Sequence, residues 1–117
     1  MAGVKYPPSP IYDILYLLNH FTMKLNLDQV CVNLDGSPLT QNDVNLTFGR
    51  AFAEVLMSSK SEDKLRSYTL AQLLYKGGEI ELTESDVQFI KDSVKRNENW
   101  ATLVLGQLEL FLTKIKT

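Results

Sequence analysis

The sequence predicts a mostly helical α+β domain, with about five helices and a small two- or three-stranded sheet. In most of the chain, apolar residues recur three and four positions apart, which is helical spacing. In a few short segments they alternate with polar residues, which is typical of a strand with one buried face. The 117 residues, 44% of them hydrophobic and 22% charged, suit a single domain with one core. Within it we distinguish an N-terminal extension over residues 1–27 from a core over 28–117.

The N-terminal extension is expected to contain an apolar helix over about residues 10–23. Ser9 followed by Pro10 provides an N-cap and a first helical residue. The apolar stretch 11–18 is broken by Asp13 and is much shorter than the ~20 residues that a membrane span requires. No small-residue cleavage site follows it. We therefore expect no membrane association and a cytoplasmic location.

Strands are predicted over residues 29–34, 43–46 and 79–82. Val30, Val32 and Leu34 alternate with polar or small residues, and the turn-forming sequence "DGSPLTQND" (35–43) comes next. Val44 begins the return strand. The third strand, "EIEL", alternates acidic with apolar residues, which indicates one solvated face.

Four further helices follow from local capping and periodicity. Thr47 is expected to cap the first of them, Ser61 the second, which ends at Gly77-Gly78, and Thr83 the third, through the capping-box-like "TESD". The last helix is predicted over about 100–115. Its apolar residues and those of the other helices recur at i, i+3 and i+4, as in Phe48, Ala51, Phe52, Val55 and Leu56, and in Val87, Ile90 and Val94.

The segment "VNLDGSPLTQND" (32–43) is the best candidate for a metal site. Placing Gly36 at the sixth position of a calcium loop puts Cys31, Asn33, Asp35 and Asn42 at the first, third, fifth and twelfth positions. Two of these four are suitable ligands, and the twelfth position lacks its carboxylate, so the segment favours a turn.

Zinc chemistry and nucleophilic catalysis are also poorly supported. The chain has one cysteine, Cys31, which suits a small core residue, and one histidine, His20, which suits a helix surface. No phosphate-binding glycine motif is present. We predict no catalytic residue, no metal, no cofactor and no small-molecule substrate.

Two charged clusters are further candidates for a site. The carboxylates Glu79, Glu81, Glu84 and Asp86 could hold magnesium or act as an acid and a base, but a strand's solvated face and a helix first turn account for them. The bases Lys91, Lys95 and Arg96 could meet phosphate or an acidic partner. The net charge of −2 argues against nucleic acid as the partner.

The last helix carries the candidate interaction surface, which consists of Leu103, Gly106 and Leu110. The other apolar residues of this helix fill one arc that suffices for a core face, and the two leucines lie apart from it. Gly106 is on the same flank, where it would let another backbone approach. The surface could pair with a partner or a second copy. Alternatively, the apolar N-terminal helix covers it within the monomer.

Three segments, "LTFGRAFAEVLMSS" (46–59), "DKLRSYTLAQLLYKGGEIELTESDVQFIKDSV" (63–94) and "LVLGQLELFL" (103–112), resemble small uncharacterised proteins encoded by tailed phages and prophages. The resemblance spans about residues 30–115 and leaves out the first 27. It implies a phage-type protein that acts in the host cytoplasm.

The expected function is that of a non-enzymatic accessory protein working through protein–protein contacts, for example on a host or defence protein, with self-association as another outcome. The alternatives are a virion-assembly factor, such as a tail or head chaperone, and a DNA-binding regulator. A hydrolase or nuclease comes last.

Overall fold

The computed structural model describes residues 22–114 and has a mostly helical α+β fold, which confirms the predicted class. This part of the chain contains four helices, against about five predicted for the whole. The predicted helix over 10–23 lies outside the described residues except for its last two positions, and those belong to a strand. The helices are α2 (Phe48–Ser58), α3 (Lys64–Lys76), α4 (Glu84–Arg96) and α5 (Thr102–Thr113), and the strands are β1 (Thr22–Asn26), β2 (Thr40–Gln41), β3 (Val44–Asn45) and β4 (Glu79–Thr83).

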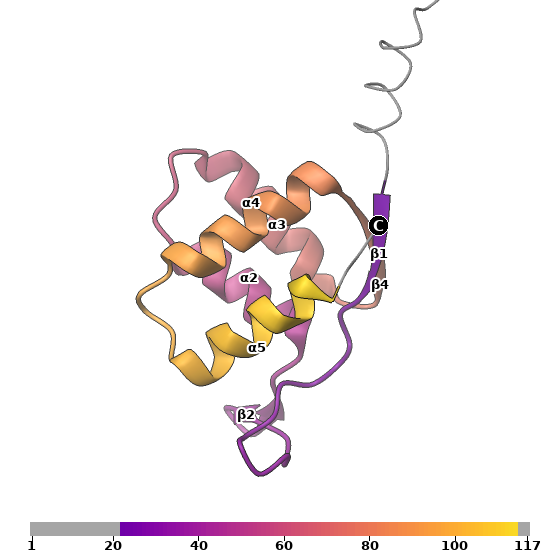
Figure 1. Ribbon diagram of the computed structural model, residues 1–117, viewed down its shortest axis with the longest axis vertical. Coiled ribbons are helices and arrows are strands. Elements are labelled where there is room, and N and C mark those ends of the chain that lie inside the picture. The colour runs from indigo at the N-terminus through magenta and orange to yellow at the C-terminus, as the bar shows by residue number, and fades with distance from the viewer. Residues whose placement is uncertain (1–21, 115–117) are drawn as a thin grey trace, which may run out of the picture.

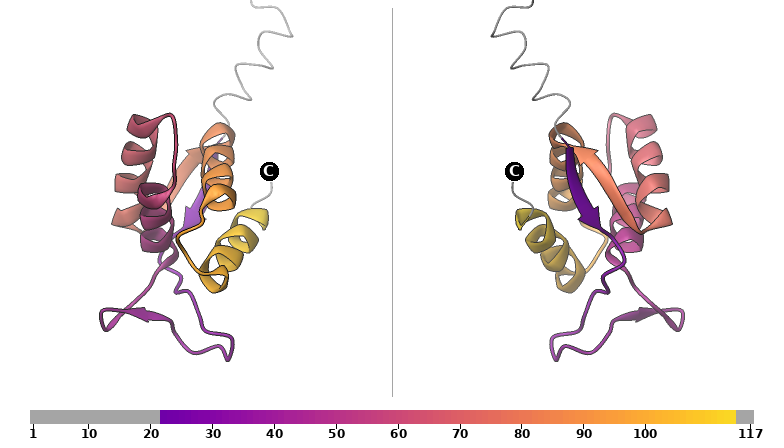
Figure 2. Two further views of the ribbon diagram at one scale, coloured as in Figure 1. Left: turned by 90° about the vertical axis from the view of Figure 1, so that its left-hand side faces the viewer. Right: turned by 90° about the vertical axis from the view of Figure 1, so that its right-hand side faces the viewer.

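The helices form two layers with the core between them. Helices α2 and α3 lie side by side in one layer, and α4 and α5 form the other (Figures 1 and 2). Helix α2 contacts both helices of the opposite layer. The pair β1 and β4 closes one side of the body, whereas β2 and β3 project from one end (Figure 2). The largest fully buried side chains include Phe52, Leu25, Leu27, Leu46, Leu56, Leu74, Ile90, Leu108 and Leu112.

The main sheet pairs the two distant segments β1 and β4 antiparallel, with Thr22 opposite Thr83 and Asn26 opposite Glu79. The predicted strand over 79–82 is thus confirmed and extends to Thr83. Strand β1 was not predicted. Its residues Met23 and Leu25 are buried while their neighbours are exposed, which is a period of two. The helix predicted over 10–23 overlaps this strand at Thr22 and Met23. Tertiary pairing with β4 decides between the two patterns.

The prediction of a strand over 29–34 was wrong. Only isolated bridges form there, between Val30 and Thr47 and between Val32 and Pro38. Cys31 is fully buried, as expected of a core thiol, whereas Val32 and Leu34 are exposed. The chain turns at once, because the Asp35 carboxylate accepts hydrogen bonds from the backbone N–H of Ser37 (2.9 Å) and from its hydroxyl (2.7 Å).

The predicted strand over 43–46 is present as the shorter β3, which pairs with β2 instead of joining the main sheet. Strand β2 lies in the segment predicted as a turn. The reversal itself occurs at Asn42 and Asp43, whose φ angles of 55° and 66° are left-handed. This is the conformation that tight hairpins require of both central residues.

Two of the three predicted N-caps are confirmed. The Thr47 hydroxyl accepts from the N–H of Arg50 (3.2 Å), and the Thr83 hydroxyl accepts from the N–H of Asp86 (3.1 Å). At α3 the cap is Asp63 and not Ser61, because the Asp63 carboxylate reaches the N–H of Arg66 (3.0 Å). The Ser61 hydroxyl accepts from the N–H of Asp63 one step earlier (3.1 Å). Each cap pairs a backbone N–H that the helix itself leaves free.

We expect Thr83→Ala to lower the free energy of unfolding by about 1 kcal/mol, because it removes the cap of α4. Urea denaturation measures the change. Thr102→Ala is the matched control, since α5 begins without a side-chain cap. Equal losses from both substitutions would contradict a capping role for Thr83.

Candidate interaction surfaces

The candidate residues of the sequence analysis lie on the outer side of α5. Leu110 is exposed and Leu103 is half-buried. A Cβ added to Gly106 would meet nothing within 4 Å. Two of the three positions are therefore open in the described structure. The apolar N-terminal helix predicted as an alternative cover for this surface lies outside the described residues, apart from its last two positions.

Gln107, between Gly106 and Leu110, connects α5 to the loop between β1 and β2. Its amide nitrogen donates to the carbonyl of Val32 (2.7 Å), and its amide oxygen accepts from the N–H of Val32 (2.9 Å). The same nitrogen also donates to the carbonyl of Leu103 (2.9 Å). The Gln107 amide thus pairs with both the backbone N–H and the backbone carbonyl of Val32. The spacing of apolar residues gave no sign of this contact.

A groove of about 500 Å³, which we call the β1–α5 groove, lies between β1 and the second half of α5. Leu110 lies in its lining, whereas Leu103 and Gly106 do not. Two aromatic rings stack within it, those of Phe48 and Phe111, with centroids 4.7 Å apart. The full lining is Lys24, Leu25, Asn26, Gln29, Val32, Phe48, Gln107, Leu110, Phe111 and Lys114.

A second apolar surface, the α2–α3 face, was missed by the sequence analysis. Met57 of α2 and Tyr68 and Tyr75 of α3 are each more than half exposed, at 51%, 53% and 56%. They surround a groove of about 440 Å³ to which the small residues Ala53 and Ala71 also contribute. Tyr68, Gln72 and Tyr75 follow one another at helical spacing, on a different side of α3 from the buried Ser67, Leu70, Ala71 and Leu74. Helical spacing alone does not show which of these two sides the fold covers.

The acidic cluster does not converge on one point. Glu79, Glu81 and Glu84 are exposed, and Glu81 accepts a hydrogen bond from the Thr22 hydroxyl (3.2 Å). Asp86 instead forms an ion pair with Arg66 (2.9 Å). Within residues 22–114 no three His, Cys, Asp or Glu side chains are placed to hold a metal ion.

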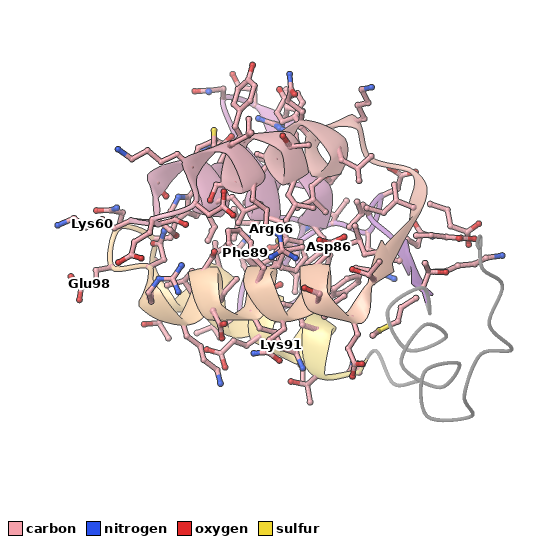
Figure 3. The ribbon with its side chains drawn as sticks, turned by 90° about the horizontal axis from the view of Figure 1, so that it is seen from above. Lys60, Arg66, Asp86, Phe89, Lys91 and Glu98 are labelled. Carbon is pink, nitrogen blue, oxygen red and sulfur yellow. The ribbon has the colours of Figure 1, made fainter. Side chains whose placement is uncertain are left out.

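Arg66 links α3 to α4. Its guanidinium lies 4.7 Å from the centre of the Phe89 ring and also bonds the hydroxyl of Ser85 (2.9 Å). Figure 3 shows Arg66, Asp86 and Phe89 together between the two helices, with Lys60 and Glu98 at the far end. A guanidinium over an aromatic face is favourable. The arrangement holds the two layers together on this side.

The loop compared with a calcium site, and predicted to be a turn, uses its polar groups in internal hydrogen bonds. The amide nitrogen of Asn33 donates to the Ser37 hydroxyl (3.1 Å), and hydrogen bonds from Ser37 lower the pKa of the Asp35 carboxyl. Burial raises the pKa of the Cys31 thiol to about 11, so this thiol is neutral at physiological pH. These contacts are those of a closed turn.

The bases of α4 are spread along the helix. Lys95 and Arg96 are exposed and Lys91 is half-buried. Arg96 donates from Nε to the carbonyl of Lys60 (3.3 Å), which directs it along the protein surface. Among the described helices, none is long and apolar enough to cross a bilayer.

Comparisons with known proteins give no relative: no family model, no curated protein and no solved structure matches this chain.

Proposed function

We propose that this protein is a non-enzymatic accessory protein that acts by binding another protein, and that the α2–α3 face is its binding surface. The assignment to phages rests on the resemblance carried by residues 46–59, 63–94 and 103–112. The observation that carries the binding role is the exposed group Met57, Tyr68 and Tyr75 around one groove.

These residue types favour protein recognition. Tyrosine and methionine are enriched in the buried centres of interfaces, and methionine adapts its shape to a partner. A single exposed apolar side chain needs no explanation, but a contiguous group marks a contact site. The groove between two helices, with alanines in its lining, is suited to the apolar side of a partner helix. Glu54, Gln72 and Lys76 complete the lining and provide a polar rim.

The test is partner capture from infected or expressing cells with tagged full-length protein, comparing wild type with Tyr68→Ala/Tyr75→Ala. Two central aromatic residues are expected to contribute ~2 kcal/mol each, so the double variant should weaken binding by ~10²- to 10³-fold. Both side chains are largely exposed, so the circular dichroism spectrum and melting curve should be unchanged.

Leu65→Ala is the matched control. Leu65 is 76% exposed on the same helix but does not line the groove. Capture that is lost with the tyrosine variant and kept with this control supports the proposal. Capture that survives in both rejects the α2–α3 face. Copurification with heads or tails would favour an assembly factor. A low-salt electrophoretic shift abolished by Lys91→Ala/Lys95→Ala would favour a DNA-binding regulator.

A further inference from the structure

The β1–α5 groove combines a free strand edge, an apolar lining and positive charge. Strand β1 pairs only with β4 within the described residues, so its other edge carries no strand. Three consecutive β1 residues, Lys24, Leu25 and Asn26, line the groove. Successive side chains of a strand point to opposite faces, so three in a row indicate that the edge itself borders the groove. Unpaired backbone groups at such an edge are available to an added strand.

The lining of the groove is amphipathic. Leu110 and the stacked Phe48 and Phe111 supply apolar surface. Asn26, Gln29 and Gln107 contribute side-chain amides. This combination is suited to a peptide, whose apolar side chains need a pocket and whose backbone needs hydrogen-bonding partners.

Every charge that lines the groove is positive. Lys24 and Lys114 are the two charged residues of the lining, and both are exposed. Glu81 lies opposite Lys24 in the sheet and accepts a hydrogen bond from the Thr22 hydroxyl, but it does not line the groove. Within residues 22–114 neither lysine forms an ion pair. A ligand with carboxylates would meet complementary charge here.

We propose that the β1–α5 groove binds an extended, acidic segment of a partner protein. The segment adds to the free edge of β1, places an apolar side chain against Leu110 and Phe111, and brings carboxylates to Lys24 and Lys114. The proposal shares with the proposed function only the premise that the ligand is a protein. It concerns a different surface, so each can fail without the other.

The test measures binding of full-length protein to three sets of fluorescent peptides of about six residues, the usual length of a strand. The sets share the same variety of Leu, Val, Phe and Ser, and carry Glu, Gln or Lys at two or three fixed positions. The Glu set should bind most tightly, and added salt should weaken that binding.

Charge reversal at the groove distinguishes specific from general attraction. Lys24→Glu/Lys114→Glu should weaken the Glu set about tenfold or more and transfer the preference to the Lys set. Leu110→Ser should weaken binding of both the Glu set and the Lys set, because it removes apolar surface that does not depend on charge. Lys95→Glu, an exposed cation of α4 outside the groove lining, is the matched control and should reduce binding of the Glu set no more than twofold. All four substituted residues are exposed, so the melting curves of the three variants should match that of the wild type.

Three outcomes would overturn the proposal. The first is equal binding of the three peptide sets, or none above background. The second is an equal loss from Lys95→Glu and from the double reversal. The third is another occupant: a dimer that the double reversal dissociates would assign the groove to a second copy, and peptide binding seen only after deletion of residues 1–21 would assign it to that segment.

Discussion

Gly49→Ala is expected to lower the free energy of unfolding by about 2 kcal/mol, although alanine is the better helix former. A Cβ at this position of α2 would lie 2.5 Å from the backbone carbonyl oxygen of Leu74 in α3 and 3.2 Å from the Cβ of Leu27. A backbone oxygen cannot rotate away, so the two helices must separate. Overpacking of this kind costs ~1–3 kcal/mol or more, which exceeds the helix-propensity gain of ~1 kcal/mol.

Gly106→Ala provides the matched control, because it makes the same change in another helix with open space around the new methyl group. It should raise the free energy of unfolding by ~0.5–1 kcal/mol. Urea unfolding of both variants measures the two changes in the free energy of unfolding, which should have opposite signs. If Gly49→Ala proved as stable as the wild type, the close packing of α2 on α3 would be wrong. Gly106→Ala also tests the α5 surface: weaker self-association or partner binding in this more stable variant would show that another backbone approaches there.

Asn97→Ala should cost about 3 kcal/mol, because one buried side chain joins three parts of the fold. The Asn97 amide nitrogen donates to the hydroxyls of Ser58 (3.0 Å) and Ser59 (2.8 Å) and to the carbonyl of Val55 (3.3 Å). Its oxygen accepts from two backbone N–H groups at the start of the α4–α5 connection, those of Asn99 and Trp100 (both 2.9 Å). Removing the side chain leaves the backbone N–H groups of Asn99 and Trp100 without their acceptor, at ~1–3 kcal/mol for each one that water does not reach. The Val55 carbonyl keeps the hydroxyls of Ser58 and Ser59 as donors.

Asn99→Ala is the comparison for this prediction. Asn99 is exposed and its side chain makes one hydrogen bond, to the carbonyl of Ser58 (2.7 Å), so the expected loss is ~0.5–1 kcal/mol. Thermal and urea unfolding should rank the two variants clearly. Asn97→Asp separates the two halves of the network, because a carboxylate keeps the acceptor for Asn99 and Trp100 but cannot donate. A loss for Asn97→Asp close to that for Asn97→Ala would place most of the stabilisation in the donated bonds.

The helices could be predicted because their determinants are local. Thr47 and Thr83 each cap a helix that begins at the next residue, and Val87, Ile90 and Val94 are all buried, as their spacing indicates. The start of α5 was placed slightly early. Trp100 is held in the connection by its hydrogen bond to Asn97, a contact that periodicity cannot reveal.

The sheet was harder to predict because its partners are distant in the chain. Met23, Leu25 and Leu27 fit a strand, yet the preceding apolar residues also fit a helix. The pairing with β4 selects the strand over the helix for this segment. Conversely, Val30, Val32 and Leu34 have a strand pattern but no continuous partner strand, and Val32 instead bonds to Gln107.

The interaction surfaces depend on which side of each helix the fold covers. Leu110 could be identified because α5 has more apolar residues than one core face needs. The α2–α3 face could not, since Tyr68 and Tyr75 are compatible with a core until α2 is seen to cover the other side of α3. Likewise, Lys24 and Lys114 lie near opposite ends of the described chain, and tertiary structure brings them to one groove.

The pairing of β1 with β4 also determines the order in which the chain can fold during synthesis. Glu81, which pairs with β1 through Thr22, lies 59 residues further along the chain. Synthesis of that stretch takes about 3–12 s at ~5–20 residues per second. Helices α2 and α3 are neighbours in the sequence, so they can pack against each other as soon as both have been synthesised, well before β4. Met23 and Leu25 have no strand to pair with during that interval. We therefore expect the apolar residues of β1 to stay unpaired on the nascent chain, accessible to chaperones, until β4 emerges.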